Sequence, residues 1–178
     1  TYERLKQGAL QWPCPTPQHR STMRRYTNNV FSHPDGKARF LPHEQEPPAE
    51  PPDEQFPLIL TTGRVRDQWH TMTRTGKIPV LMKKEPEPFV EMHPADAARL
   101  GIGEGELVTV RSRRGEATAA CRITEAIKLG TCFMPFHWGS LRGAAVVNQA
   151  TIEAFDPISK QPELKFCAVR IERALGAQ

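Results

Sequence analysis

Residues 93–123 read HPADAARLGIGEGELVTVRSRRGEATAACRI, and this stretch decides the fold. Its first part, HPADAARLG, predicts a compact helix, because Pro94 suits a first helical turn and Gly101 suits a helix end. Residues 103–123 alternate apolar and polar side chains on both sides of Gly115. This alternation predicts two antiparallel strands that are joined by a tight turn.

Short apolar runs elsewhere in the chain predict four more strands. They are PLILTTG (57–63), PFVEMH (88–93), GTCFMPF (130–136) and KFCAVRI (165–171). One helix among roughly six strands indicates a small, mainly β barrel with short helices and not a layered α/β fold.

The amino-terminal third of the chain has a different composition. Residues 42–57 hold six prolines and five acidic residues without any Lys or Arg, a composition that predicts an extended strap. Residues 1–41 show no sustained helical or strand periodicity, so we expect an irregular segment that packs on another surface. We therefore predict an irregular lead-in with a Pro-rich acidic strap at residues 1–56 and a barrel domain at residues 57–178.

Composition and charge argue against several classes of protein. The 178 residues are 38% hydrophobic and 25% charged, as in ordinary globular proteins. The apolar runs are too short for a membrane span, and no signal-peptide core follows the first charges, so we expect a cytoplasmic protein. The net charge of +4 comes without basic runs interleaved with aromatics, which argues against nucleic-acid binding and permits a small anionic ligand. The sequence begins at Thr1 and not with Met, so we expect a piece of a longer protein.

The four cysteines, Cys14, Cys121, Cys132 and Cys167, are widely spaced and form no Cys-x-x-Cys pair. This spacing argues against a zinc or iron–sulfur site within the chain. The last three lie in apolar stretches and are expected to be small buried hydrophobic residues.

Two other groups of polar residues are expected to have structural roles. His93 precedes Pro94 and is interpreted as a helix-entry residue. Arg111, Arg113 and Arg114 flank the predicted hairpin turn. We interpret them as exposed charge, with contact to a redox partner as the alternative.

A dense set of polar side chains follows the first predicted strand, in TTGRVRDQWHTMTRTGK (residues 61–77). Gly63 ends that strand, and its missing side chain lets backbone amides approach a ligand closely. The arginines and threonines beyond it suit a phosphate group or a polar ring. Trp69 and His70 offer a flat face and a polar edge. The alternative is a solvated loop in which Trp69 plugs the end of the barrel.

Three stretches resemble known families. The pattern AxxLGIxxGExVxV at residues 97–110 resembles the helix-to-strand element of double-psi β-barrels, which identifies a fold and not a function. TGRVRDQWHTMTRTGK (62–77) resembles the start of the last domain in enzymes that carry two molybdopterin guanine dinucleotides. FMPFHWGSLRGAAVVNQATIEAFDPISKQPELKFCAVRIE (133–172) is similar to the assimilatory nitrate reductase branch. The similarity covers roughly residues 57–173.

The resemblance implies a cofactor site. The residues that would bind the dinucleotide are Thr62, Gly63, Arg64, Trp69, His70, Thr71, Asn148 and Lys165. Phe136 aligns with an aromatic residue at the mouth of the substrate funnel. His137-Trp138 beside it departs from the Phe-Asp of periplasmic and respiratory relatives, which favours the assimilatory branch. Taken alone, Asn148 would be a turn residue and Lys165 a solvated surface lysine. No metal ligand or catalytic residue is expected in this chain.

The implied complete enzyme is a nitrate reductase that reduces nitrate to nitrite by two electrons at molybdenum bis(molybdopterin guanine dinucleotide). Its iron–sulfur cluster would lie in upstream domains, so we expect this chain alone to be inactive and to bind cofactor weakly or not at all. The expected partners are those upstream domains and an electron donor such as ferredoxin, flavodoxin or an NADH-linked reductase, without nucleic acid or membrane. One alternative is the same domain of a formate dehydrogenase or another molybdopterin oxidoreductase. The other is a non-enzymatic double-psi barrel that serves as an interaction module.

Overall fold

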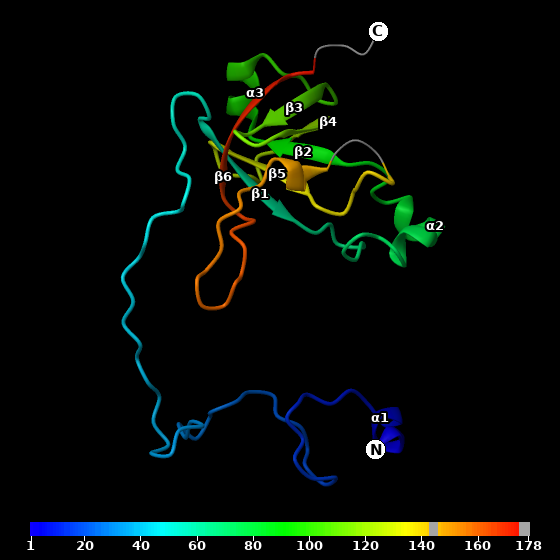
Figure 1. The fold of residues 1–178 in the computed structure, drawn as a ribbon. Coiled ribbons are helices and arrows are strands. Elements are labelled where there is room, and N and C mark those ends of the chain that lie inside the picture. Colours follow the sequence, from blue (N-terminus) through cyan, green and yellow to red (C-terminus); the bar gives the residue numbers. More distant parts are fainter. Residues whose placement is uncertain (143–145, 175–178) are drawn as a thin grey trace. The chain divides into compact units, whose positions relative to one another are not determined.

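The computed structural model describes residues 1–142 and 146–174, which form parts of two compact units, Thr1–Gln45 and Glu46–Gln178 (Figure 1). The first unit contains one short helix, α1 (Tyr2–Lys6), whose first turn is capped where the amide of Arg4 donates to the Thr1 hydroxyl at 3.3 Å. The rest of this unit is irregular, as the lack of periodicity predicted. Among the described residues, no helix has the length and apolarity needed to cross a membrane.

The second unit is a closed six-stranded barrel (Figure 1). Its strands are β1 (Leu58–Gly63), β2 (Phe89–Met92), β3 (Leu107–Arg111), β4 (Glu116–Ile123), β5 (Thr131–Pro135) and β6 (Cys167–Arg173). They neighbour one another in the order β1-β5-β2-β4-β3-β6, and β6 closes onto β1. The pairs β1/β5 and β2/β4 are parallel, and the other four pairs are antiparallel. The predicted class, a mainly β double-psi barrel with short helices, is confirmed.

Short helices connect the strands, and α3 is the one that the sequence predicts. They are η1 (Thr75–Lys77), α2 (Pro79–Met82), α3 (Pro94–Leu100) and η2 (Val147–Gln149). At the start of α3, His93 Nδ1 accepts from the amide of Ala95 at 3.2 Å. At its end, Gly101 adopts a left-handed conformation with φ of 66°, which glycine tolerates best. The roles predicted for His93, Pro94 and Gly101 are therefore confirmed.

The β3/β4 hairpin lies directly against η2. A Cβ at Gly115 would lie 2.7 Å from the carbonyl oxygen of Gln149, so only glycine fits at this turn without moving backbone. This close approach fixes η2, and with it Asn148, relative to the barrel wall.

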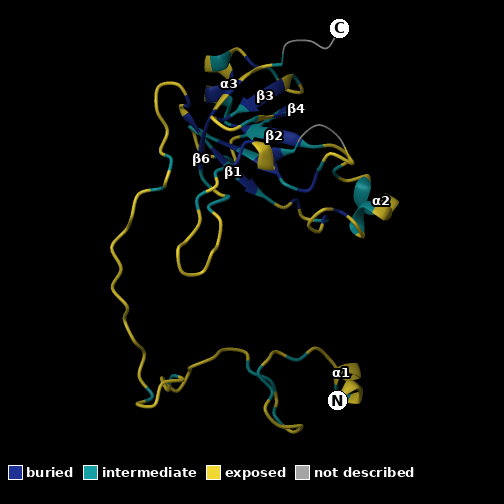
Figure 2. Ribbon diagram, in the orientation of Figure 1, coloured by how far each residue is buried: buried dark blue, intermediate teal, exposed yellow. Residues whose placement is uncertain are grey.

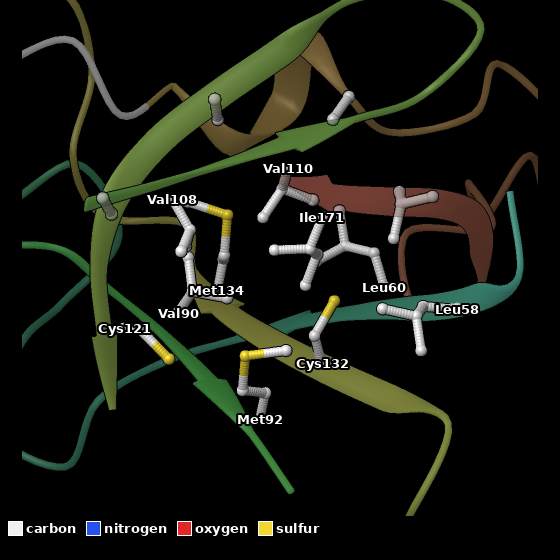
Figure 3. Packing of buried hydrophobic residues seen from close by; sticks show 14 of the residues in the cluster. Leu58, Leu60, Val90, Met92, Val108, Val110, Cys121, Cys132, Met134 and Ile171 are labelled. Carbon is white, nitrogen blue, oxygen red and sulfur yellow. The ribbon is translucent and has the colours of Figure 1, made fainter. Parts of the chain in front are cut away.

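Apolar side chains fill the interior of the barrel (Figure 3), and buried residues recur along its strands (Figure 2). The strands bury alternate residues, so that Leu58 and Leu60 of β1 and Met134 of β5 point inward. The buried thiols are part of this core. Cys121, Cys132 and Cys167 are free and buried, as predicted, and burial raises the pKa values of Cys121 and Cys167 to about 11.

Glu50 attaches the acidic strap to the barrel. Its carboxylate accepts hydrogen bonds from Arg114 at 2.6 and 3.0 Å and from the amide of Ala168 at 3.1 Å. Arg114 also donates through Nε to the carbonyl of Thr151 at 2.8 Å. One guanidinium thus joins the strap, the hairpin turn and the segment that follows η2.

Arg114 is an exposed residue, as interpreted from the sequence, but its guanidinium is not free charge, because it is bonded to Glu50 and to the carbonyl of Thr151. Arg111 and Arg113 also form ion pairs, with Glu172 at 3.0 Å and with Asp53. Residues 46–56 of the predicted strap group with the barrel in one compact unit. The predicted domain limits at residues 56 and 57 stay a prediction.

We expect Leu60→Ala to lower the free energy of unfolding by about 2–5 kcal/mol, because Leu60 is fully buried and its truncation leaves a cavity. Leu129→Ala is the matched control, since Leu129 is 57% exposed and should change stability by less than about 0.5 kcal/mol. Urea unfolding followed by circular dichroism measures both. Equal losses in the two variants would contradict the interior placement of Leu60.

We expect Glu50→Gln to destabilise the chain by about 2 kcal/mol near neutral pH, because it leaves Arg114 without its charged partner. The hydrogen bond from Arg114 lowers the pKa of Glu50 from its ordinary 4.5, although partial burial acts in the opposite sense. The carboxylate therefore contributes stability above about pH 4.5, and this contribution is lost as pH falls through the folded pKa.

The difference between wild type and Glu50→Gln should thus shrink in urea titrations at about pH 3.5. Glu54→Gln removes an exposed carboxylate and should match wild type at both pH values. A pH-independent difference for Glu50→Gln would rule out the carboxylate as the source of the effect.

Candidate functional site

Three polar segments meet at one end of the barrel. Strands β1 and β5 run parallel, with Gly63 paired to Pro135 at their carboxyl ends. The loop after β1 and the segment after β5 therefore leave the barrel at the same end. Strand β6 runs antiparallel to β1, so the residues just before β6 reach this end too. We call residues 64–75 the polar loop.

Thr62, Lys165 and Phe136 come together at this end. The Thr62 hydroxyl donates to the carbonyl of Leu164 at 2.8 Å, and Lys165 Nζ donates to the carbonyl of Thr62. The same Nζ lies 6.0 Å from the centroid of the Phe136 ring. The Thr62 side chain is buried and occupied by this bond, so it holds the segment before β6 against β1.

Gly63 is required at the end of β1 by close packing. A Cβ at this position would lie 2.8 Å from a ring carbon of Phe133 and 3.8 Å from Lys165 Nζ. The missing side chain thus lets the Phe133 ring pack directly against the end of the strand.

The polar loop presents most of its polar side chains to solvent, whereas Val65, Gln68 and Met72 are buried. The Arg64 guanidinium lies 4.9 Å from the centroid of the Trp69 ring, and the Trp69 and His70 rings meet edge to face at 4.7 Å. The hydroxyls of Thr71 and Thr73 lie 2.6 Å apart. Trp69 is 57% exposed, so the alternative in which it plugs the end of the barrel is wrong.

His137 holds the polar loop in place, which the sequence did not predict. It is buried, and its Nε2 accepts from the amide of Val65 at 3.0 Å while its Nδ1 lies 2.6 Å from the carbonyl oxygen of His70. These contacts bridge both ends of a turn whose later residues, His70 and Met72, adopt left-handed backbone with φ of 41° and 59°. The sequence does hold a signal for this role, since His137 lies within the largely apolar run FMPFHW and a buried imidazole needs a hydrogen-bond partner for each nitrogen.

The two hydrogen bonds define the protonation state of His137. A carbonyl only accepts, so Nδ1 must carry the proton, and an amide only donates, so Nε2 must be unprotonated. The ring is therefore neutral in the folded chain. Burial lowers the pKa of His137, and the nearby charge of Arg64 acts in the same direction.

A cavity of about 800 Å³ opens beside the polar loop. Three predicted site residues line it: Thr71, Phe136 and Asn148. A neighbouring hollow of about 370 Å³ is lined by Trp69, His70 and Thr71, among others. The remaining predicted residues, Thr62, Gly63, Arg64 and Lys165, lie at the same end of the barrel but are not among the described residues that line either space.

Two cations that the sequence did not single out, Lys77 and Arg142, also line the larger cavity. Lys77 ends the polar stretch at residues 61–77 and Arg142 lies six residues before Asn148, but neither was assigned a role from the sequence. The site as a whole combines cations, hydroxyls, one amide and aromatic faces, which suits a polar, ring-containing and anionic ligand.

Because His137 is neutral when folded, acid should destabilise the chain. The unfolded ring takes up a proton below about pH 6.5 whereas the folded ring does not, so stability falls as pH drops from 6.5 toward the lower folded pKa. When the pH falls from 7.5 to 5.5, we expect the His137→Gln variant to lose about 1 kcal/mol less free energy of unfolding than wild type. Thermal or urea unfolding at the two pH values measures it.

His43→Gln is the control, since His43 is exposed in the other unit and should leave the pH dependence of wild type unchanged. If His137→Gln and wild type lose equal stability over this range, the neutral bridge is not the titrating element.

Comparison with known proteins places these features in a family. Residues 58–168 match the family model described as Molydopterin dinucleotide binding domain. The nitrate reductase of Synechocystis sp. is 48% identical over 177 residues, which cover 96% of this chain and 25% of that protein. The F420-dependent formate dehydrogenase subunit alpha of Methanocaldococcus jannaschii is 45% identical, with 97% and 25% covered. The assimilatory nitrate reductase catalytic subunit of Bacillus subtilis is 40% identical, with 96% and 24% covered.

The chain thus spans about a quarter of the length of these relatives. Among solved structures, acetylene hydratase from Pelobacter acetylenicus matches with a TM-score of 0.58 and 21% identity, over 66% of this chain and 18% of that chain. This structural likeness concerns the fold alone. The family match over most of the barrel and the identity across nearly the whole chain show that the chain belongs to the molydopterin dinucleotide binding domain family.

Proposed function

We propose that this chain is the cofactor-binding, carboxy-terminal domain of a molybdenum-dependent nitrate reductase and that it binds molybdopterin guanine dinucleotide. The observation that carries the proposal is the convergence of the polar loop, Phe136, Asn148 and Lys165 on one end of the barrel. An interaction module would have no need for this convergence. The convergence therefore supports a cofactor-binding domain over a non-enzymatic interaction module.

The residues at this end fit a pterin dinucleotide. Asn148, with two donors and an acceptor, and the Thr71 hydroxyl face a cavity that can hold a polar ring. Arg64 supplies a guanidinium for a phosphate oxygen, and the exposed Trp69 supplies a flat face. Lys165 adds a positive charge beside the Gly63 turn.

When the cofactor is bound, its molybdenum supplies the two-electron chemistry that converts nitrate to nitrite. The residues of this chain would bind and orient the dinucleotide, and His137 would keep the polar loop in its binding conformation. In this proposal the iron–sulfur cluster belongs to upstream domains, and ferredoxin, flavodoxin or an NADH-linked reductase is the electron donor. We propose a cytoplasmic location for the assimilatory enzyme.

A formate dehydrogenase is the second candidate. The relative from Methanocaldococcus jannaschii named as such is 45% identical to this chain, close to the 48% of the Synechocystis nitrate reductase. Assays of the full-length parent protein separate the two. Nitrate reduction by reduced methyl viologen supports the first proposal, and formate oxidation with benzyl viologen supports the second.

We expect Asn148→Ala and Lys165→Gln in the full-length parent protein to lower its bound cofactor, by about tenfold in affinity, because each removes a polar contact. The measurement is GMP released from the dinucleotide per polypeptide, together with viologen-linked activity. Gln149→Ala and Lys128→Gln are matched controls, since Gln149 is an exposed amide that does not line the cavity and Lys128 precedes β5 at the opposite end.

Unchanged cofactor content and activity in both site variants would refute the assignment of these residues. A parent protein that contains no molybdopterin at all would refute the proposed function.

A further inference from the structure

The arginines of the barrel unit fall into two groups. One group has a carboxylate oxygen within 4.0 Å of a side-chain nitrogen: Arg99, Arg111, Arg113, Arg114, Arg122, Arg170 and Arg173. The second group has no such partner in the part of the chain that the structure describes: Arg64, Arg66, Arg74 and Arg142. Every arginine of this second group lies in the polar loop or in the segment after β5.

This division shows where positive charge is left unneutralised. The arginines around the barrel wall have carboxylate partners, whereas those at the site end have no carboxylate partner among the described residues. Unpaired cations around a concave surface create a positive potential that attracts anions. The one carboxylate within the polar loop, that of Asp67, is itself paired with Lys84 at 3.0 Å.

Two cations direct this charge at the larger cavity. Arg142 and Lys77 line it, and none of its described lining residues is Asp or Glu. The hydroxyls of Thr71 and Thr73 line the same wall and lie 2.6 Å from each other. The described residues of this wall therefore combine two positive charges with hydroxyl donors and include no competing negative charge.

Gly76 provides the place where the Arg142 guanidinium rests. A Cβ at Gly76 would lie 2.7 Å from one terminal nitrogen of Arg142, 2.8 Å from Cζ and 3.0 Å from the other nitrogen. Nearly equal distances to all three atoms mean that the flat face of the guanidinium covers Gly76. The ends of the guanidinium are then free to donate a pair of hydrogen bonds to one ligand.

We propose that Arg142, seated on Gly76, forms together with Lys77 an oxyanion-binding subsite in the cavity wall. This inference rests on the proposed function and adds to it residues to which no role was assigned from the sequence. The ligand is an oxyanion with at least two acceptor oxygens, because guanidinium presents two parallel donors. A phosphate group of the bound dinucleotide and a small inorganic oxyanion such as nitrate share this chemistry.

The test uses isotope-labelled chain titrated by NMR with inorganic pyrophosphate and, separately, with nitrate in chloride buffer. Arg142→Gln removes the charge. Gly76→Ala keeps the charge but displaces the guanidinium, which can move without disturbing the fold because it is the end of a flexible side chain. Arg39→Gln is the control, since it makes the same change of charge at an exposed residue of the other unit.

Pyrophosphate should shift the amide signals of Gly76 and Lys77, and both site variants should weaken its binding about tenfold or more. Arg39→Gln should change the affinity less than about twofold. If nitrate, and not pyrophosphate, shifts these signals and binds more weakly to both site variants, the subsite is assigned to a small oxyanion. The proposal is overturned if neither anion shifts these amides, or if Arg39→Gln weakens binding as much as Arg142→Gln.

The cofactor content of the full-length parent protein separates the two proposals. If the parent protein carries the dinucleotide but anion binding by the chain does not depend on Arg142, the subsite is wrong and the proposed function stands. If anion binding depends on Arg142 but the parent protein contains no molybdopterin, the subsite stands and the proposed function is wrong.

Discussion

The parallel pairing of β1 with β5 is the constraint on which the site depends. Because the two strands run in the same direction, the segments that leave Gly63 and Pro135 begin side by side, although about seventy residues separate them in the chain. The antiparallel β6 then brings Lys165 to the same place. Closure of the barrel leaves no free strand edge, so polar groups available to a ligand are those of the loops at its ends.

The barrel and the site use charge in opposite ways. Around the barrel wall, charged side chains satisfy one another, and the pair of Glu50 with Arg114 ties the strap to the backbone of Thr151, close to η2. At the site end, Lys165 donates to the backbone of Thr62, and other backbone groups are held by neutral contacts. His137 is the main example, since an uncharged ring bridges two backbone groups of the polar loop and leaves the cations around it free.

The features that the sequence predicted correctly are local in the chain. Alternation along residues 103–123 and the cap residues of α3 specify the hairpin and the helix through neighbours only a few positions away. The pairing of Arg114 was not predicted because its partner Glu50 lies 64 residues earlier. The roles of His137 and of Arg142 over Gly76 also depend on contacts across the fold. The proposed cofactor residues come from family resemblance, since composition alone left a solvated loop as an equal alternative.

The burial of three of the four thiols has a practical meaning for work with this chain. Cys121, Cys132 and Cys167 are enclosed in the barrel, where burial raises their pKa values and keeps them in the unreactive thiol form. Cys14 is partly exposed in the other unit. A maleimide reagent should therefore attach a fluorophore at Cys14 while the barrel stays folded, and a chain that carries more than one adduct in a mass spectrum would be one whose barrel has opened.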